Sequence, residues 1–284
     1  MSRQTRHLTE QRAELRKGRK RRLTRRRAVG ALSAAIGLTA AAVVTNVMLS
    51  PAGAAPAWPD PSGERAVAET IEVSGEYDGG FKRFYGEGDL GGGDQGEGQD
   101  PVFKLADGAV LKNVVLGAPA ADGIHCMGSC TLENVWWEDV GEDAATFKGT
   151  SESARYAVVG GGARKAHDKV FQFNGTGTLT VSGFQVSDFG KLVRSCGNCS
   201  EQHKRTIVVD DVDITAPGKS IVGINTNYGD TATLRTIRIH GDDDRKIDTC
   251  ARYTGNDSGD EPDETGSGPD GKFCLFTDQD ISYQ

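Results

Sequence analysis

Charged residues recur at similar points of successive segments between residues 122 and 199. Asp122, Asp143 and Asp168 align with one another at separations of 21 and 25 residues. The next alignment column holds Gly123, Ala144, Lys169 and Lys191. A repeat of this length without helical periodicity is typical of a solenoid, in which neighbouring coils lie about 4.8 Å apart. We therefore expect these carboxylates and lysines to gather on one face and to form a ligand site.

Carboxylates are especially dense around Gly141. The alignment brings together Asp122, Asp139, Glu142 and Asp143. Four carboxylates at close quarters repel one another unless a hard cation neutralises them, and an oxygen-only ligand set suits calcium. The spacing is not that of an EF-hand. An acidic turn that faces solvent is the alternative, but it does not explain why Asp122 comes from the preceding coil.

Three basic residues follow the acidic turn on the next coils. Lys169, Lys191 and Arg194 beside a calcium ion would form a positive pocket on an otherwise acidic protein. Such a pocket suits a ligand that carries carboxylate groups. The alternative is that the two lysines only pair with Asp168 and Asp188, which would leave their shared alignment column unexplained.

Short runs rich in β-branched residues would provide the strands that position these side chains. Their first residues lie 21 to 28 positions apart, and Gly, Asn or Asp bounds each run. The runs are Val110–Leu116, Thr131–Trp136, Tyr156–Val159, Thr178–Phe184, Thr206–Val212 and Thr233–Ile239. Helical periodicity is absent from this part of the sequence, and tight hairpin signals are scarce. We therefore predict an all-β, single-domain, right-handed parallel β-helix rather than an antiparallel sandwich.

The N-terminal residues predict export. Residues 1–27 hold twelve Lys and Arg against two Glu, and residues 28–50 carry no charge. A stretch of small residues at 51–57, PAGAAPA, suits a signal peptidase. We therefore interpret residues 1–57 as an export signal, cleaved near Ala54 or Ala57, and expect the protein to be secreted and extracellular. An uncleaved anchor is the alternative, because about 22 apolar residues can span a bilayer.

Removal of the export signal leaves an acidic domain. Residues 58–284 hold 21 Lys and Arg against 38 Asp and Glu, which is a net charge of −17. This charge argues against nucleic acid as a partner. Much of the excess lies in Asp242–Asp244 and in the acidic segment Thr254–Gly271. About 225 residues suffice for a single hydrophobic core, and we expect a monomer without stable membrane association after signal cleavage.

All six cysteines lie in the predicted secreted domain, which indicates disulfides. Local spacing favours the pairs Cys126–Cys130, Cys196–Cys199 and Cys250–Cys274. The third pair would close the acidic segment. A zinc site that combines Cys196, Cys199 and His203 is the alternative, but the sequence has no second Cys-x-x-Cys motif to accompany it.

Four longer motifs resemble a known family. The segments PAADGIHC (119–126), ENVWWEDVGEDA (133–144), HDKVFQFN (167–174) and FGKLVRSCGNC (189–199) are similar to those of the pectate lyases of polysaccharide lyase family three. The resemblance extends over nearly all of residues 64–284. It implies that residues 58–284 form a secreted parallel β-helix that cleaves de-esterified pectin by calcium-dependent β-elimination.

The same resemblance assigns roles to individual residues. The calcium carboxylates of the family match Asp122, Glu142 and Asp143, to which we add Asp139 as an outer neighbour of the ion. The basic catalytic residues match Lys169, Lys191 and Arg194, and a substrate-binding glutamate matches Glu97. The resemblance favours Arg194 as the base, with the two lysines on the substrate carboxylate. From side-chain chemistry alone, a lysine would be the simpler base because its pKa is lower.

The implied reaction is consistent with these residue types. Elimination from a galacturonan removes the proton on C5, next to the C6 carboxylate, and expels the oxygen on C4. Positive charges bound to that carboxylate would stabilise an enolate-like transition state, and either base would favour an alkaline optimum. A hydrolase of the same fold would instead need an acid and a base carboxylate without the lysines. A non-catalytic glycan-binding β-helix would not need the three basic residues.

Overall fold

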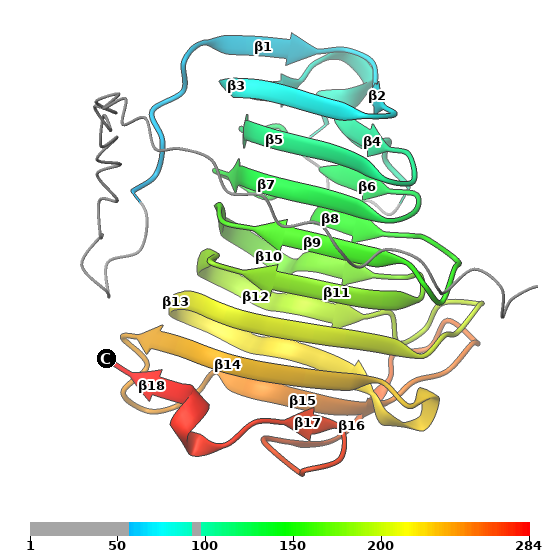
Figure 1. The fold of residues 1–284 in the computed structure, drawn as a ribbon, viewed down its shortest axis with the longest axis vertical. Helices are drawn as coiled ribbons and strands as arrows, with labels where there is room; N and C mark the ends of the chain where they lie inside the picture. The colour runs from blue at the N-terminus through cyan, green and yellow to red at the C-terminus, as the bar shows by residue number, and fades with distance from the viewer. Residues whose placement is uncertain (1–56, 93–97) are drawn as a thin grey trace, which may run out of the picture. The chain divides into compact units, whose positions relative to one another are not determined.

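The computed structural model describes residues 57–92 and 98–284, in which successive coils of parallel strands stack on one another (Figure 1). In this described part of the chain, eighteen strands form one continuous hydrogen-bonded sheet that winds around the core. The strand pairings divide into three columns, and the long strands bend from one column into the next. The only helices in the described residues are short 3-10 turns, at Gly88–Leu90, Thr226–Tyr228 and Asp278–Asp280.

The first column of pairings carries the predicted functional residues, and we call it the site face. It comprises β2 (Ile71–Val73), β4 (Phe103–Leu105), β6 (Ile124–Cys126), β8 (Asp143–Phe147), β10 (Gly162–Phe173), β12 (Gln185–Ser195), β13 (Arg205–Asn225) and β15 (Asp248–Thr254). Because the strands are parallel and in register, residues from distant parts of the sequence become neighbours on adjacent coils.

The other two columns complete each coil. The second comprises β1 (Glu64–Val67), β3 (Glu76–Gly86), β5 (Ala109–Leu116), β7 (Cys130–Trp137), β14 (Thr231–His240) and β18 (Ile281–Tyr283), with parts of β10, β12 and β13. The third comprises β9 (Arg155–Val159), β11 (Gly177–Ser182) and β17 (Cys274–Leu275), with the remaining parts of β3, β5, β7, β13 and β14. The β-branched composition of these strands suits a pleated surface that is buried on one side.

Inward-pointing side chains stack from coil to coil beneath the site face. The successive rungs hold Ile124, Ala145, Phe171, Val193 and Val222, all with no exposed surface. Each of the four larger side chains in this stack contributes about 1.5–3 kcal/mol when fully buried, and Ala145 contributes less. The stack therefore fixes the strands, and outward-pointing residues between these positions are held on a rigid frame.

The predicted fold is confirmed. Each of the six predicted runs lies in a strand, although the run Thr178–Phe184 continues two residues beyond β11. Parallel pairing between coils excludes the antiparallel sandwich, and the architecture is the expected right-handed parallel β-helix. All three disulfides pair as the spacing suggested, and the zinc hypothesis is wrong because Cys196 and Cys199 bond to each other.

The acidic segment departs from the coil pattern. It contains β16 (Asp263–Ser267), which folds back and pairs antiparallel with β15. The Cys250–Cys274 disulfide closes this insertion before the chain rejoins the coils at β17. The sequence did not predict this hairpin.

Two predictions concern residues beyond the described ranges. The export signal lies almost entirely within residues 1–56, and Glu97 lies within residues 93–97; neither part is described. Within the described ranges, no helix has the length and apolar character needed to cross a membrane.

Candidate active site

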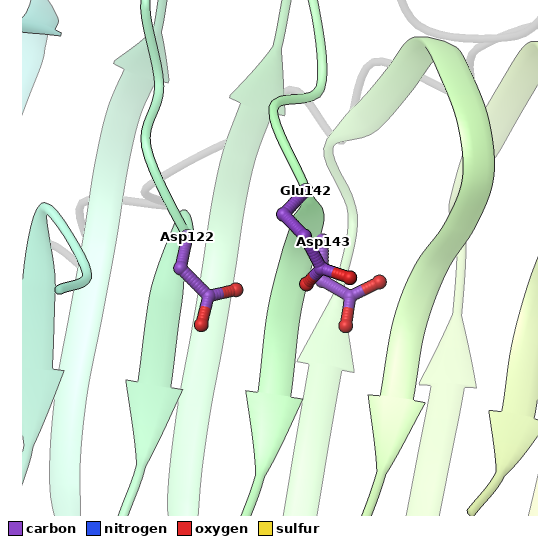
Figure 2. A group of neighbouring side chains, drawn as sticks. All are labelled: Asp122, Glu142 and Asp143. Carbon is purple, nitrogen blue, oxygen red and sulfur yellow. The ribbon is translucent and has the colours of Figure 1, made fainter. Parts of the chain in front are cut away.

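Three buried carboxylates meet at the start of two neighbouring strands of the site face. Asp122 lies two residues before β6, and Glu142 and Asp143 lie at the start of β8. One carboxylate oxygen of each residue lies within 4.8 Å of those of the other two. Figure 2 shows the three carboxyl groups side by side on the adjoining strands. The structure thus brings together the predicted ligand set, and we call these three residues the carboxylate cluster.

A glycine allows the two coils to approach this closely. Gly123 has a φ of +50°, a left-handed conformation that side chains disfavour. A Cβ at this position would also collide with the backbone oxygen of Ala144 on the next coil. This explains why a glycine follows Asp122 in the sequence: Gly123 lets Asp122 lie beside the start of β8.

The carboxylate cluster has the properties of a cation site. Within the described residues, Oδ1 of Asp122 and Oδ1 of Asp143 are buried and have no hydrogen-bond partner. Burial raises the pKa of Asp143 to about 9; Lys169 opposes this shift, and the carboxylates of Glu142 and Asp122 add to it. Buried acceptors without donors are costly unless a cation or water satisfies them. An oxygen-only donor set of this kind fits calcium.

A lysine from the next coil gives the cluster one positive charge. Nζ of Lys169 lies 3.3 Å from Oε1 of Glu142 and 3.6 Å from Oδ1 of Asp143. On the other side, Nε2 of His125 lies 2.6 Å from Oδ2 of Asp122. One ammonium beside three buried carboxylates leaves negative charge uncompensated, so these contacts do not replace a divalent ion.

The predicted alignment of the coils is wrong by one residue at β10. In the structure Lys169 lies opposite Asp143 on one side and opposite Lys191 on the other, whereas the alignment placed Asp168 beside Asp143. The offset is present along the whole of this coil, because Trp137 on β7 pairs with Ala163 and Asp143 on β8 pairs with Lys169, and both pairs are 26 residues apart. The correction moves Lys169 into direct contact with the carboxylate cluster.

Asp168 holds the two lysines together instead of lining the cluster. Its Oδ2 accepts a hydrogen bond from Nζ of Lys169 at 2.8 Å, and its Oδ1 accepts one from Nζ of Lys191 at 2.9 Å. Burial acts to raise the pKa of Asp168, but the hydrogen bonds and charges of both lysines outweigh it and lower the pKa to about 2. Ion pairing of the lysines, which the sequence left as an alternative, therefore occurs with Asp168 but not with Asp188.

Arg194 is buried at the end of β12, and its contacts are with neutral groups. Nη1 donates hydrogen bonds to the backbone oxygen of Ser195 at 2.7 Å and to Oδ1 of Asn225 at 3.1 Å. The ring of Tyr253 lies 4.0 Å from Cζ of the guanidinium. Arg194 forms no ion pair with any described carboxylate, and burial lowers its pKa from the ordinary value although more distant acidic groups oppose this.

Asp139 lies outside the carboxylate cluster. Its side chain is partly exposed and forms an ion pair with Lys165, whose Nζ lies 3.3 Å from Oδ2. It belongs to the bend that precedes β8, where the chain has not yet reached the site face. The predicted role of Asp139 as an outer neighbour of the ion therefore stays a prediction, and the carboxylate cluster itself does not include this residue.

The basic residues line one groove, together with residues that the sequence did not reveal. The groove is lined by Asp168, Lys169, Gln172, Lys191, Arg194, Gly197, Asn198, Tyr253, Glu261 and Pro262. Gln172 could have been found, because it lies between Thr146 and Arg194 on successive rungs. Glu261 had no such signal, since it comes from the inserted acidic segment, whereas Tyr253 lies on the coil strand β15 opposite Asn225. A larger hollow near Trp58 and His240 lies over the second-column parts of β10, β12 and β13 and does not include the basic residues.

We expect the pH dependence of stability to depend on the cluster. The pKa of Asp143 is 3.8 in the unfolded chain and about 9 in the folded protein, so the folded state binds more protons between these values. In a chelator, the melting temperature should therefore fall as the pH rises through this range, and calcium should restore it. Asp143→Asn should flatten both responses in circular dichroism melts, whereas Asp139→Asn should preserve them. A pH response of the Asp143→Asn variant that equals the wild-type response would contradict the assignment.

Fold and site together define a class of protein. A parallel β-helix presents a buried carboxylate cluster, two lysines and a buried arginine on one face, and a groove passes over the basic residues. Buried, partly uncompensated charges in a groove are typical of catalytic sites. The molecule is therefore a β-helix protein with an active site suited to an acidic ligand.

Comparisons with known proteins identify the family. The pectate lyase family model matches residues 55–260. Pectate lyase H of Emericella nidulans is 47% identical over 227 residues, which cover 78% of this chain and 84% of that protein. Pectate lyase E of the same organism is 44% identical over 225 residues, which cover 78% of this chain and 85% of that protein. The chain belongs to the pectate lyase family and is a polysaccharide lyase.

Solved structures agree with this assignment. The catalytic domain of pectate lyase PelI from Erwinia chrysanthemi has a TM-score of 0.68 and 33% identity, and the match covers 78% of this chain and 100% of that one. PelI in complex with tetragalacturonic acid has a TM-score of 0.66 and 32% identity, and the match covers 77% of this chain and 70% of that one. The resemblance seen in the sequence motifs is thus confirmed.

Proposed function

We propose that this protein is a secreted pectate lyase that cleaves α-1,4-linked polygalacturonate by calcium-dependent β-elimination to 4,5-unsaturated oligogalacturonides. The observation that carries the proposal is the buried carboxylate cluster, in which one oxygen of Asp122 and one of Asp143 have no hydrogen-bond partner, beside a groove that contains Lys169, Lys191 and Arg194. The tetragalacturonic acid complex of PelI supports the substrate class.

The carboxylate cluster and the lysines would act on the substrate carboxylate. Asp122, Glu142 and Asp143 would hold calcium, which supplies positive charge to the C6 carboxylate of a galacturonate unit. Lys169 and Lys191 would bind the same carboxylate. Asp168 fixes both ammonium groups, so their charge is already in place before the transition state forms.

Arg194 would take the proton from C5. The pair of electrons from the C5–H bond then forms the double bond between C4 and C5, and the C4 oxygen leaves with the electrons of its bond to C4. Burial lowers the pKa of Arg194 and no described carboxylate pairs with it, which favours a neutral guanidine. Lys169 is the poorer base: burial lowers its pKa, but the charge of Asp143 and the other nearby carboxylates raises it well above the ordinary value. The rate should therefore rise toward alkaline pH.

The chemistry of the product tests this function. Elimination creates a conjugated double bond that absorbs ultraviolet light, whereas hydrolysis or binding does not. Polygalacturonate treated with the protein in calcium should gain this absorbance, and a chelator should abolish the gain. Reducing ends that appear without ultraviolet absorbance would indicate a hydrolase, and binding without cleavage would indicate a glycan-binding protein. Either result would refute the proposal.

We further propose that residues 1–57 direct export and that residues 58–284 act as a monomer. The basic N-terminal region, the uncharged stretch and the small residues before Trp58 support export. N-terminal sequencing of protein recovered from the culture medium should give a start near residue 55 or 58. Light scattering coupled to size-exclusion chromatography should give the mass of one chain. Protein that stays with the membrane fraction, or a dimer mass, would contradict the respective proposal.

A further inference from the structure

The inserted hairpin covers the arginine of the active site. Its first strand, β15, carries Tyr253, whose ring centroid lies 4.0 Å from Cζ of Arg194. Its loop contributes Glu261 and Pro262 to the wall of the groove. We propose that Tyr253 is a positioning residue that holds the Arg194 guanidinium in its reactive orientation, and that the acidic segment Thr254–Gly271 serves to hold Tyr253.

The contacts of the guanidinium show why it needs this ring. Ser195 and Asn225 accept hydrogen bonds from Nη1 only, so they hold one end of the planar group. Asn225 is fully buried, and its Nδ2 donates to the backbone oxygen of Cys196 at 2.9 Å, which sets the orientation of its amide. Hydrogen bonds at one end leave the plane free to tilt. An aromatic ring against one face removes that freedom and excludes water from it.

A glycine makes the stacking possible across an intervening strand. Arg194 lies on β12 and Tyr253 on β15, and β13 runs between them with Gly223 directly opposite Arg194. A Cβ at Gly223 would lie 2.8 Å from Cδ of Arg194 and 3.3 Å from Cε2 of Tyr253. Any side chain at this rung would separate the ring from the guanidinium. The absence of one is what lets the two groups meet.

Contacts of the acidic segment fix the strand that carries Tyr253. Tyr253 pairs with Glu264 in the antiparallel β15–β16 ladder. The loop is hydrogen-bonded to the segment that follows β12, because the backbone N–H of Asn256 donates to the backbone oxygen of Gly197 at 2.7 Å. Gln202 adds a second tie to Asn256 at 2.8 Å. The hairpin is therefore attached at both sides of the groove and keeps the ring in place.

The inference rests on the proposed role of Arg194 as the base, and kinetics test both. Tyr253→Leu should lower kcat about 10- to 100-fold with KM within about twofold, because a small misplacement of the base slows proton transfer without affecting binding. Tyr253→Phe should recover most of this loss, since it keeps the ring. The matched control is Tyr283→Leu, which removes the ring that lies 4.5 Å from Cζ of Arg245 outside the groove, and it should leave kcat unchanged.

A double-mutant cycle separates positioning from a general structural effect. If Tyr253 acts through Arg194, the Tyr253→Leu change should cost much less in an Arg194→Lys background. Equal losses in both backgrounds, a wild-type kcat for Tyr253→Leu, or an equal loss in Tyr283→Leu would overturn the inference.

An NMR measurement without substrate distinguishes failure of the positioning inference from failure of the proposed function. The Nε–H resonance of Arg194, assigned by comparison with Arg194→Lys, should be sharp in the wild-type NMR spectrum and should broaden or disappear in Tyr253→Leu. Tyr253→Phe should retain it. An unchanged resonance in Tyr253→Leu would overturn the positioning role even if the protein proves to be a lyase. A wild-type protein that forms no unsaturated product would instead refute the proposed function, while the resonance still decides the positioning.

Discussion

Arg194→Lys should lower kcat by about 100- to 10,000-fold while KM stays within about threefold, the range expected for loss of a general base. A lysine ammonium cannot reach the same point as the planar guanidinium, and it would lose both the hydrogen bond to Asn225 and the stacking on Tyr253. Initial rates of ultraviolet absorbance on polygalacturonate across alkaline pH would measure the effect.

The control for this substitution is Arg164→Lys. Arg164 also stacks on an aromatic ring, at 4.3 Å from the centroid of Trp58, but it does not line the groove of the basic residues. The Arg164→Lys variant should retain the wild-type rate of product formation. Substantial activity of Arg194→Lys together with an inactive Lys169→Arg variant would move the base to Lys169, the choice that side-chain chemistry alone favours.

Asp143→Ala should abolish detectable activity at low calcium, a loss of at least about 100-fold, and should leave the far-ultraviolet circular dichroism spectrum unchanged. The residue contributes a buried oxygen without a hydrogen-bond partner to the carboxylate cluster, so its removal takes away one of three expected ligands. Lys169 keeps its contacts with Glu142 and Asp168, which limits the structural damage.

Calorimetry provides a readout that does not depend on activity. The wild-type protein should bind calcium, and Asp143→Ala should bind it far more weakly. Asp139→Asn is the matched control, since Asp139 pairs with Lys165 outside the cluster and should not affect calcium binding. An Asp143→Ala variant that remains active in excess chelator would show that the cluster is not the metal site.

The coil architecture and the gathering of charges on one face were determined by sequence alone. Strands that recur at similar intervals, with Gly, Asn or Asp at the bends, are local signals, and a solenoid turns regular spacing into spatial proximity. That is why Asp122 and Asp143 could be predicted to meet, and why Lys169 and Lys191 could be placed on adjacent coils. The disulfides Cys126–Cys130 and Cys196–Cys199 followed from the same locality.

Only the tertiary structure decided which charges touch. The coil from β8 to β10 is 26 residues long, one more than the separation of Asp143 and Asp168 in the sequence alignment, which sets Lys169 against Asp143 and leaves Asp168 to bridge the lysines. The exact length of a coil depends on how the chain turns around the core, and spacing alone does not reveal it. The same limit applies to Asp139, which is close to the cluster in sequence but turned toward Lys165.

The surroundings of Arg194 also required the tertiary structure. Asn225 and Tyr253 come from later coils, a glycine on the intervening rung lets the ring reach the guanidinium, and an irregular hairpin pairs with the strand that carries the ring. The hairpin interrupts the repeat, so no periodic signal points to it. Contacts that depend on such an interruption have no counterpart in the spacing of the sequence.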